Sequence, residues 1–232
     1  IELIESWVKN SIIELVQSNK FNPLAVNFAT YGATLAYIDS HGKRLTPICN
    51  YLKPLDESIP EALYKKYGGK NEFCRCTASP ALGMLNSGIQ ALWLKKKKPE
   101  VFSKTRYILH FPQYFLFLFT GRTVSEHTSI GCHTAMWNFD KMTYHRWIKD
   151  ENIKVPDPVP VTTMYETVIS KAKIKIGTGL HDSSASLAPF FNPDVGNFIL
   201  VSTGTWCISM NPFNNEPLTT EELEQDCLCY MS

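Results

Sequence analysis

The segment Lys173–Met210 reads KIKIGTGLHDSSASLAPFFNPDVGNFILVSTGTWCISM and contains two short apolar runs, each ended by a polar turn with glycine. In the first run isoleucines alternate with lysines, a pattern that predicts a strand. The glycines that follow permit the tight or positive-φ backbone of a strand-to-helix corner. The segment therefore predicts a strand, a turn and a helix of small residues, with His181 and Asp182 at the turn.

Asp182 allows two interpretations. The ordinary one is a helix N-cap, whose carboxylate accepts the unpaired N–H groups of the first helical turn. The other is a catalytic base at the carboxyl end of a strand, where open α/β sheets place their ligands. The local pattern is compatible with both, because both place an acidic side chain where a strand passes into a helix.

The second apolar run predicts a hairpin. Phe198–Val201 and Trp206–Met210 have the composition of strands, and Ser202–Thr205 joins them. Such a turn directs backbone N–H groups and hydroxyls to one point, which suits a phosphate group. Serine, threonine and glycine also dominate ordinary hairpin turns, so the pattern alone does not establish a phosphate site.

The two turns read GLHDSSAS at Gly179–Ser186 and VSTGTW at Val201–Trp206. Their order and spacing resemble those of the FGGY family of carbohydrate kinases, and within it the rhamnulokinase-like branch. The resemblance implies an α/β chain with the actin/hexokinase-like (ribonuclease H-like) fold, a mixed sheet flanked by helices. It also implies an ATP-dependent kinase that phosphorylates a hydroxyl of a ketose or deoxyketose such as rhamnulose or fuculose.

The same resemblance implies roles for individual residues. Asp182 takes the position of the proton acceptor, and His181 and Ser183 take those of sugar contacts. Gly204 and Thr205 take the position that contacts the phosphates of ATP, which binds together with Mg²⁺. Because an ordinary aspartate is a weak base at neutral pH, it would orient the hydroxyl and accept its proton late in the transfer.

Three segments nearer the N-terminus predict strands: Leu24–Phe28, Ala33–Ile38 and Arg44–Cys49. We expect them to form a three-stranded antiparallel run, which is typical of the fold implied by the resemblance. Pro156, Pro158 and Pro160 make a later stretch rich in proline, which is shorter than the corresponding passage of the proteins introduced by the resemblance.

The loop that joins the first two predicted strands also takes part in the resemblance. Gly32 matches a substrate contact of the rhamnulokinase-like proteins. Ala29 and Tyr31 stand where those proteins have Asp and Trp, so the polar lining of the sugar pocket differs here.

Further elements are predicted from spacing and capping residues. They are an amphipathic helix over Ile1–Leu15, helices over Ile59–Tyr67 and Ser79–Lys97, a strand and an aromatic helix in Tyr107–Arg122, and a capped helix after Thr219. The resemblance implies that residues 1–197 are a sugar-binding N-terminal domain without its first hairpin and that 198–232 begin a nucleotide-binding domain. We therefore expect the chain to be truncated at both ends and inactive alone.

Composition excludes several classes of function. The net charge of +1 provides no field to attract nucleic acid. There is no apolar run of about 18 residues and no signal peptide, so no membrane partner is expected.

The seven cysteines contain no CxxC pair, which favours reduced thiols in the cytoplasm. The histidines lack metal-ligand spacing, so we expect no protein-bound metal. The oligomeric state stays open, with a homo-oligomer among the candidates.

Two other classes of function remain as alternatives. A sugar- or phosphate-binding module without catalysis would be favoured if Asp182 proved to be a buried cap with no open pocket beside it. A hydrolase is suggested by the serine-rich corner, but the chain has no Gly-x-Ser-x-Gly motif. His181 also adjoins Ser183 too closely in sequence to act as its base.

Overall fold

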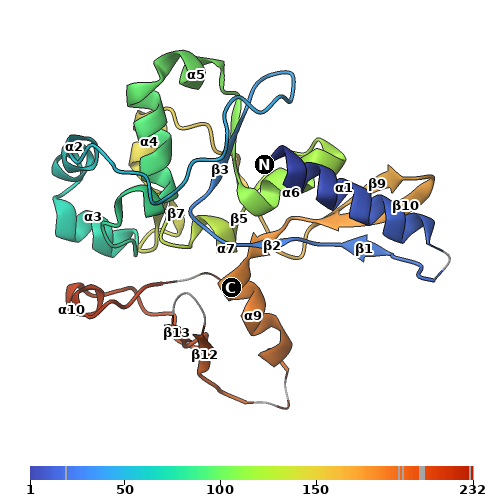
Figure 1. Cartoon of the computed structure of the whole chain (residues 1–232). Helices are drawn as coiled ribbons and strands as arrows, with labels where there is room; N and C mark the ends of the chain where they lie inside the picture. The colour runs from blue at the N-terminus through green and yellow to red at the C-terminus, as the bar shows by residue number, and fades with distance from the viewer. Residues whose placement is uncertain (19, 193, 195, 204–206, 230, 232) are drawn as a thin grey trace.

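The computed structural model describes residues 1–18, 20–192, 194, 196–203, 207–229 and 231 (Figure 1). The α-helices are α1 (Glu2–Gln17), α2 (Ser58–Lys66), α3 (Lys70–Cys76), α4 (Ser87–Lys97), α5 (Pro99–Lys104), α6 (Phe111–Thr120), α7 (His127–Ile130), α8 (Arg146–Asp150), α9 (Asp182–Leu187) and α10 (Thr220–Glu224). Short 3₁₀ turns occur at Gly83–Leu85 and Ala188–Phe190.

The strands are short, and most of them form two-stranded pairs. They are β1 (Ala25–Val26), β2 (Ala29–Thr30), β3 (Leu35–Ile38), β4 (Tyr107–His110), β5 (Ser125–Glu126), β6 (Trp137–Asn138), β7 (Thr143–Tyr144), β8 (Pro158–Val159), β9 (Met164–Ile169), β10 (Ala172–Gly177), β11 (Leu180–His181), β12 (Leu200–Thr203) and β13 (Cys207–Met210). The chain is thus a mixed α/β structure.

Parallel pairing connects the N-terminal strands to the segment after residue 170. β1 pairs with β10 in parallel, with Val26 opposite Ile176, and β2 pairs in parallel with β11. β9 joins the other edge of β10 in an antiparallel hairpin. Figure 1 shows β1 running beside β10.

The predicted three-stranded antiparallel run is wrong. β1 pairs with β10, β3 pairs with β4, and Arg44 makes only an isolated bridge to Ile38. Val26 and Phe28 pack with the isoleucines of β10, so the apolar face of the first segment is covered by a strand far away in the sequence. An apolar pattern predicts that a segment is buried but does not say against which partner.

The predicted helix over Ser79–Lys97 is shorter in the structure and begins at Ser87. Ala78 and Gly83 have positive φ, which interrupts a helical path before that point. Asn86 takes the N-cap position, and its side chain accepts the N–H of Leu82.

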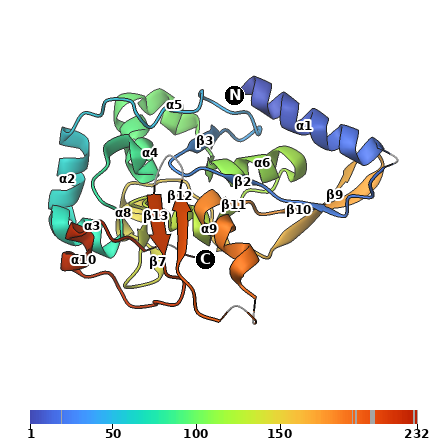
Figure 2. The same cartoon turned by 60° about the horizontal axis from the view of Figure 1, so that its bottom comes forward.

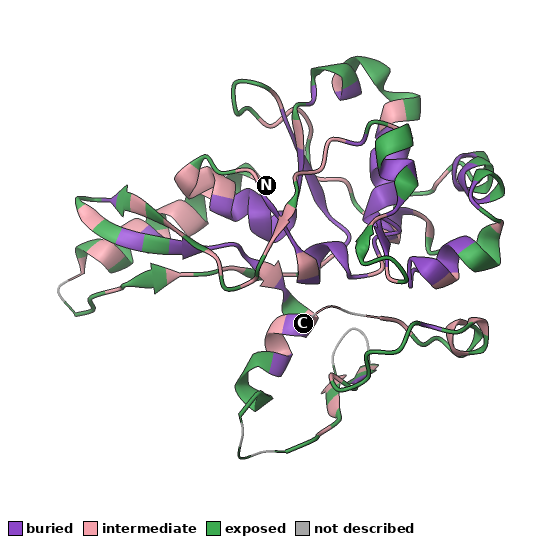
Figure 3. Cartoon of the chain, turned by 180° about the vertical axis from the view of Figure 1, so that it is seen from behind, coloured by how far each residue is buried: buried purple, intermediate pink, exposed green. Residues whose placement is uncertain are grey.

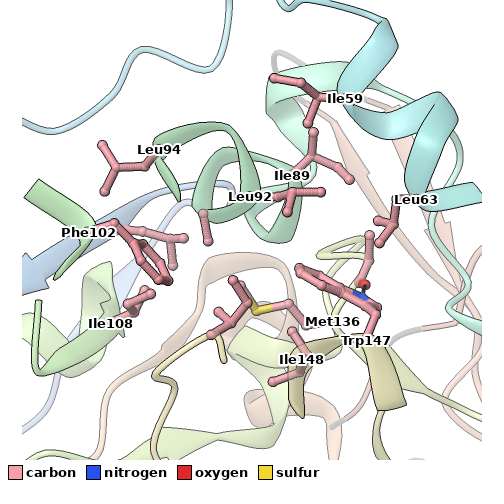
Figure 4. Close-up of a cluster of buried hydrophobic side chains, with 14 of the residues drawn as sticks. Ile59, Leu63, Ile89, Leu92, Leu94, Phe102, Ile108, Met136, Trp147 and Ile148 are labelled. Atoms are coloured by element: carbon pink, nitrogen blue, oxygen red, sulfur yellow. Dashed lines mark hydrogen bonds between the residues drawn. The ribbon is translucent and has the colours of Figure 1, made fainter. Parts of the chain in front are cut away.

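Buried apolar residues form a main cluster around α4 and Trp147, shown in Figure 4. Trp147 is fully buried, and its indole N–H donates to the carbonyl of Ala135 at 2.6 Å. We call this group the Trp147 cluster; its labelled members are Ile59, Leu63, Ile89, Leu92, Leu94, Phe102, Ile108, Met136, Trp147 and Ile148. A second cluster joins α1, α6 and β10, with Ile12, Leu116 and Ile174 at its centre. Figure 3 shows this burial concentrated inside the body that contains α4 and α6.

Residues after α9 form a smaller part of the structure. β12 and β13 form the predicted antiparallel hairpin, and Figure 2 shows them in front of the main body. α10 begins at the predicted capping box, in which Thr219 and Glu222 bond reciprocally. It lies near α3, where Arg75 donates to the carbonyl of Leu218 at 3.1 Å.

Candidate functional site

Two parallel strands end at the same edge and bring distant loops together. In the β2–β11 pair, Leu180 lies opposite Ala29 and His181 lies opposite Thr30. Because the strands run in the same direction, the residues that follow them, Gly32 in one loop and Asp182 in the other, leave the sheet on the same side. This edge is where α/β folds place their ligands.

Gly32 lies directly against His181. A Cβ atom at position 32 would lie 3.1 Å from Nε2 of His181 and 3.3 Å from Sγ of Cys132. Both distances are tighter than ordinary van der Waals contact, so a side chain here would push the imidazole or the thiol aside. The structure therefore brings together two residues that the sequence singled out from separate motifs, Gly32 and His181.

His181 is buried, with an exposed fraction of 5%, and it is held from several sides. Its Nε2 lies 3.1 Å from Sγ of Cys132 and 3.3 Å from Oδ1 of Asp182. Its backbone N–H donates to the hydroxyl of Thr128 at 2.9 Å. Burial lowers the pKa of His181 to about 4, although Asp182 opposes that shift. The imidazole is therefore neutral near pH 7, and its contact with Asp182 is not an ion pair there.

Glu126 holds His181 in place through Thr128. It is fully buried and caps α7, accepting the backbone N–H groups of Thr128 and Ser129. It also accepts the hydroxyl of Thr128 at 2.6 Å, and that hydroxyl in turn accepts the N–H of His181. Burial raises the pKa of Glu126 against the opposing effect of these hydrogen bonds. A hydrogen-bonded chain thus runs from Glu126 through Thr128 to His181.

Asp182 is the first residue of α9, and its side chain is 54% exposed. His181 takes the N-cap position, and Asp182 accepts the N–H of Ser183 at 2.7 Å. Its carboxylate is therefore accessible to a ligand. Ser183 is half-buried, and its carbonyl accepts the hydroxyl of Ser186 at 2.6 Å.

The predicted phosphate contacts, Gly204 and Thr205, lie outside the described residues. The strands on either side of them, β12 and β13, are in place as a hairpin.

Two cavities lie beside the Gly32 loop. The larger one is an open recess of about 340 Å³, and its lining residues are Tyr31, Thr34, Ile48, Cys49, Asn50 and Tyr51. The smaller one has a volume of about 10 Å³, and its lining residues are Tyr31, Gly32, Thr34, His110, Phe111, Pro112, Ser129 and His181. Tyr31 and Thr34 line both, so the two cavities are neighbours, and His181 lines the smaller one. Neither Asp182 nor Ser183 is among the residues that line these two cavities.

Sequence reasoning missed Cys132, His110 and the capping role of Glu126, although Glu126–Thr128 resembles a run that the family carries near its pocket wall. An acidic residue two positions before Thr128 and three before Ser129 is a capping pattern, so a search for capping residues could have found Glu126. Nothing local marks Cys132 or His110, because their contacts are with residues far away in the sequence.

No group of at least three His, Cys, Asp or Glu side chains suited to a metal ion occurs among the residues described. None of the described helices has the length and apolar character that a membrane span requires.

The fold and this site define a ligand-binding α/β domain with its polar residues at the ends of parallel strands. The N-terminal domain of the FGGY family of carbohydrate kinases matches residues 2–183, which is more than half of the chain, and the chain belongs to this family. The actin/hexokinase-like (ribonuclease H-like) fold implied by the sequence is confirmed, since the similar structures are sugar kinases of that fold.

Curated relatives and solved structures agree with this assignment. The chain is 24% identical to a rhamnulokinase of Halalkalibacterium halodurans over 80% of its own length and 41% of the relative's. It is 21% identical to a rhamnulokinase of Oceanobacillus iheyensis over 90% of its length and 45% of the relative's. A carbohydrate kinase from Novosphingobium aromaticivorans is 25% identical, with a TM-score of 0.81, over 98% of this chain and 50% of that one.

A ligand-bound xylulose kinase from Lactobacillus acidophilus shares the fold, with a TM-score of 0.66 and 24% identity over 80% of this chain and 40% of that one. The chain thus spans about half the length, or less, of these relatives.

Proposed function

We propose that the protein containing this chain transfers the γ-phosphoryl group of ATP to a hydroxyl of a sugar, with Asp182 as the proton acceptor. The observation that carries the proposal is the meeting of β2 and β11, which places Gly32, His181 and Asp182 at one edge of the sheet. Membership of a family of carbohydrate kinases supports the same reaction.

The geometry supports one role for Asp182, as proton acceptor, and another for His181 and Ser183, as sugar contacts. Asp182 is exposed enough to reach a sugar hydroxyl, as a proton acceptor must be. As the γ-phosphoryl group moves away from ATP in a loose transition state, the hydroxyl loses its proton to Asp182 late in the transfer. Neutral His181 and the hydroxyl of Ser183 would hydrogen-bond other sugar hydroxyls and hold the reacting one in line.

The nucleotide side of the site is proposed from the resemblance alone. Gly204 and Thr205 would contact the phosphates of ATP through backbone N–H groups and a hydroxyl. Mg²⁺ would supply charge neutralisation on the phosphate chain. Because the described part of the chain offers no cluster of metal ligands, we propose that Mg²⁺ arrives with the nucleotide.

We also propose that residues 1–197 are the sugar-binding domain and that 198–232 begin the nucleotide-binding domain, in a cytoplasmic enzyme. The family match, which ends at residue 183, supports a boundary soon afterwards. Phe213 packs on Phe198 within the later segment, and neither ring belongs to the clusters of the main body.

The proposed substrate is a ketose or deoxyketose such as rhamnulose or fuculose. Curated relatives named rhamnulokinase support that branch at low identity. A xylulose kinase and a gluconate kinase are among the structures with a similar fold, so xylulose and gluconate should be included among the candidate substrates tested.

A binding module without catalysis is the second candidate. The observation that favours it is that Asp182 and Ser183 line neither of the two cavities beside the Gly32 loop. In such a protein the sugar would sit in the recess near Tyr31 and would not be phosphorylated.

The test uses the full-length protein that contains this chain. Rhamnulose, fuculose, xylulose and gluconate are each incubated with ATP and Mg²⁺, and ADP release is measured beside calorimetric binding of the same sugars. Omission of Mg²⁺ and omission of sugar are the controls. We expect sugar-dependent ADP release with at least one sugar. A sugar that binds but is never phosphorylated would overturn the kinase proposal and support the binding module.

A further inference from the structure

The smaller cavity is lined by a histidine, His110, that the proposed mechanism does not use. His110 is the last residue of β4 and the N-cap of α6, and its exposed fraction is 3%. It lines the cavity together with His181, and the antiparallel pairing of β3 with β4 fixes its position opposite Leu35. His110 therefore lines the same small cavity as Gly32 and His181, next to the proposed sugar site.

Only one ring nitrogen of His110 has a partner in the described structure. Nε2 lies 3.2 Å from the hydroxyl of Ser87, whereas Nδ1 is buried without a hydrogen-bond partner among the described residues. Burial lowers the pKa of His110 to about 4, so the ring is neutral near pH 7. In a neutral imidazole one nitrogen donates and the other accepts. A buried ring nitrogen without a partner is unfavourable and needs a ligand atom or water.

The cavity that His110 lines is small, and its lining is mainly apolar with a few polar side chains. Thr34 and Ser129 contribute hydroxyl-bearing side chains to its lining, and both residues are buried. Its volume of about 10 Å³ corresponds to one oxygen atom, either a water molecule or a hydroxyl group. Because Tyr31 and Thr34 also line the open recess, a molecule in the recess lies next to this space.

We propose that His110 is a specificity-determining residue whose Nδ1 hydrogen-bonds one hydroxyl of the sugar in the inner cavity. The inference rests on the proposed function and deepens it, because it states that the substrate must carry a hydroxyl at the position facing His110. A hydroxyl both donates and accepts, so it fits either tautomer of the ring. A sugar with hydrogen or methyl at that position would leave Nδ1 unpaired.

The test is a deoxy scan of the best-bound sugar in the full-length protein. Each single-deoxy analogue is compared with the parent sugar by calorimetric binding and, where turnover occurs, by kcat/KM. We expect one analogue to be disfavoured by about a hundredfold or more in the wild type, since a site built around a hydroxyl rejects the analogue that lacks it. In His110→Leu the same analogue should be disfavoured by less than about fivefold, because no polar atom is left unpaired.

Two further variants distinguish a specific hydrogen bond from a general disturbance of the cavity. Phe111→Leu changes an apolar wall of the same cavity and should weaken all analogues alike. His110→Asn keeps a donor and an acceptor, and it should retain part of the discrimination if His110→Leu does not fold. An unchanged pattern of discrimination in His110→Leu, or no discriminated analogue in the wild type, would overturn the proposal and leave water as the cavity's occupant. Binding without turnover would overturn the proposed kinase function but not the role of His110, because the effect of each deoxy analogue can still be measured from its binding affinity.

Discussion

The strand-end site and the Trp147 cluster are both buried, but they contain different chemistry. The Trp147 cluster consists of aliphatic and aromatic side chains around α4. The strand-end site, by which we mean Gly32, Glu126, Thr128, Cys132 and His181, places a carboxylate, a hydroxyl, a thiol and an imidazole out of solvent. Burying polar groups is unfavourable unless they are paired, and here the hydrogen bonds from Glu126 through Thr128 end at His181, the neighbour of Asp182. We conclude that the first region provides stability, and we propose that the second provides the chemistry.

The largest expected effect on stability comes from the Trp147 cluster. Trp147→Ala removes a fully buried indole and leaves the carbonyl of Ala135 without its donor. Replacements of this kind lower the free energy of unfolding by about 3–5 kcal/mol. Denaturant unfolding monitored by circular dichroism measures the change, and kcat of the protein that remains folded should equal that of the wild type.

Leu3→Ala is the control, because Leu3 is 87% exposed and should change stability by less than about 0.5 kcal/mol. Equal losses for the two variants would show that the Trp147 cluster is not the main source of stability.

The next effect tests whether the buried carboxylate supports the site. In Glu126→Gln an amide nitrogen replaces one carboxylate oxygen, so either the N–H of Thr128 loses its acceptor, or the hydroxyl of Thr128 and the N–H of Ser129 both lose theirs. We expect a loss of about 1–3 kcal/mol in unfolding free energy. Activity should fall as well, through a raised KM for sugar, because Thr128 also holds the N–H of His181.

Glu222→Gln provides a matched comparison. Glu222 accepts the N–H and hydroxyl of Thr219 at the start of α10, but in an exposed position. Its replacement should affect stability far less and leave KM unchanged. If both variants behave alike, Glu126 is an ordinary helix cap.

A smaller effect is expected from Gly32→Ala. The φ angle of Gly32 lies outside the positive range, so alanine is compatible with the backbone, and the cost comes from the contacts with His181 and Cys132. The imidazole must move by a few tenths of an ångström, and we expect kcat/KM to fall by about tenfold, equivalent to about 1.4 kcal/mol. Steady-state kinetics with varied sugar measures the change; kinetics like those of the wild type would place the sugar away from His181.

The contrast between the two regions also separates what the sequence could predict from what it could not. The strand, turn and helix around Asp182, the hairpin of β12 and β13 and the capping box at Thr219 were predicted correctly, because each depends on neighbours in the chain. Resemblance to a family added Gly32, whose contact with His181 no local pattern could reveal.

Long-range pairing could not be predicted in this way. The strand β9 was missed because its turn to β10 uses Ser170 and Lys171, both with positive φ, in place of the usual Asn and Gly. The parallel pairing of β1 with β10 joins segments about 150 residues apart, and apolar runs do not identify their partners. His110 was overlooked for the same reason, since its cavity is assembled from several distant elements.

Asp182→Asn tests the central claim most directly when turnover and stability are measured on the same preparation. Asn keeps an oxygen that can accept the N–H of Ser183, and the side chain is more than half exposed. We predict that kcat falls by at least about a hundredfold, whereas the free energy of unfolding changes by less than about 0.5 kcal/mol. A variant that turns over sugar as fast as the wild type, or that loses stability in proportion to its activity, would show that Asp182 serves the helix and not the reaction.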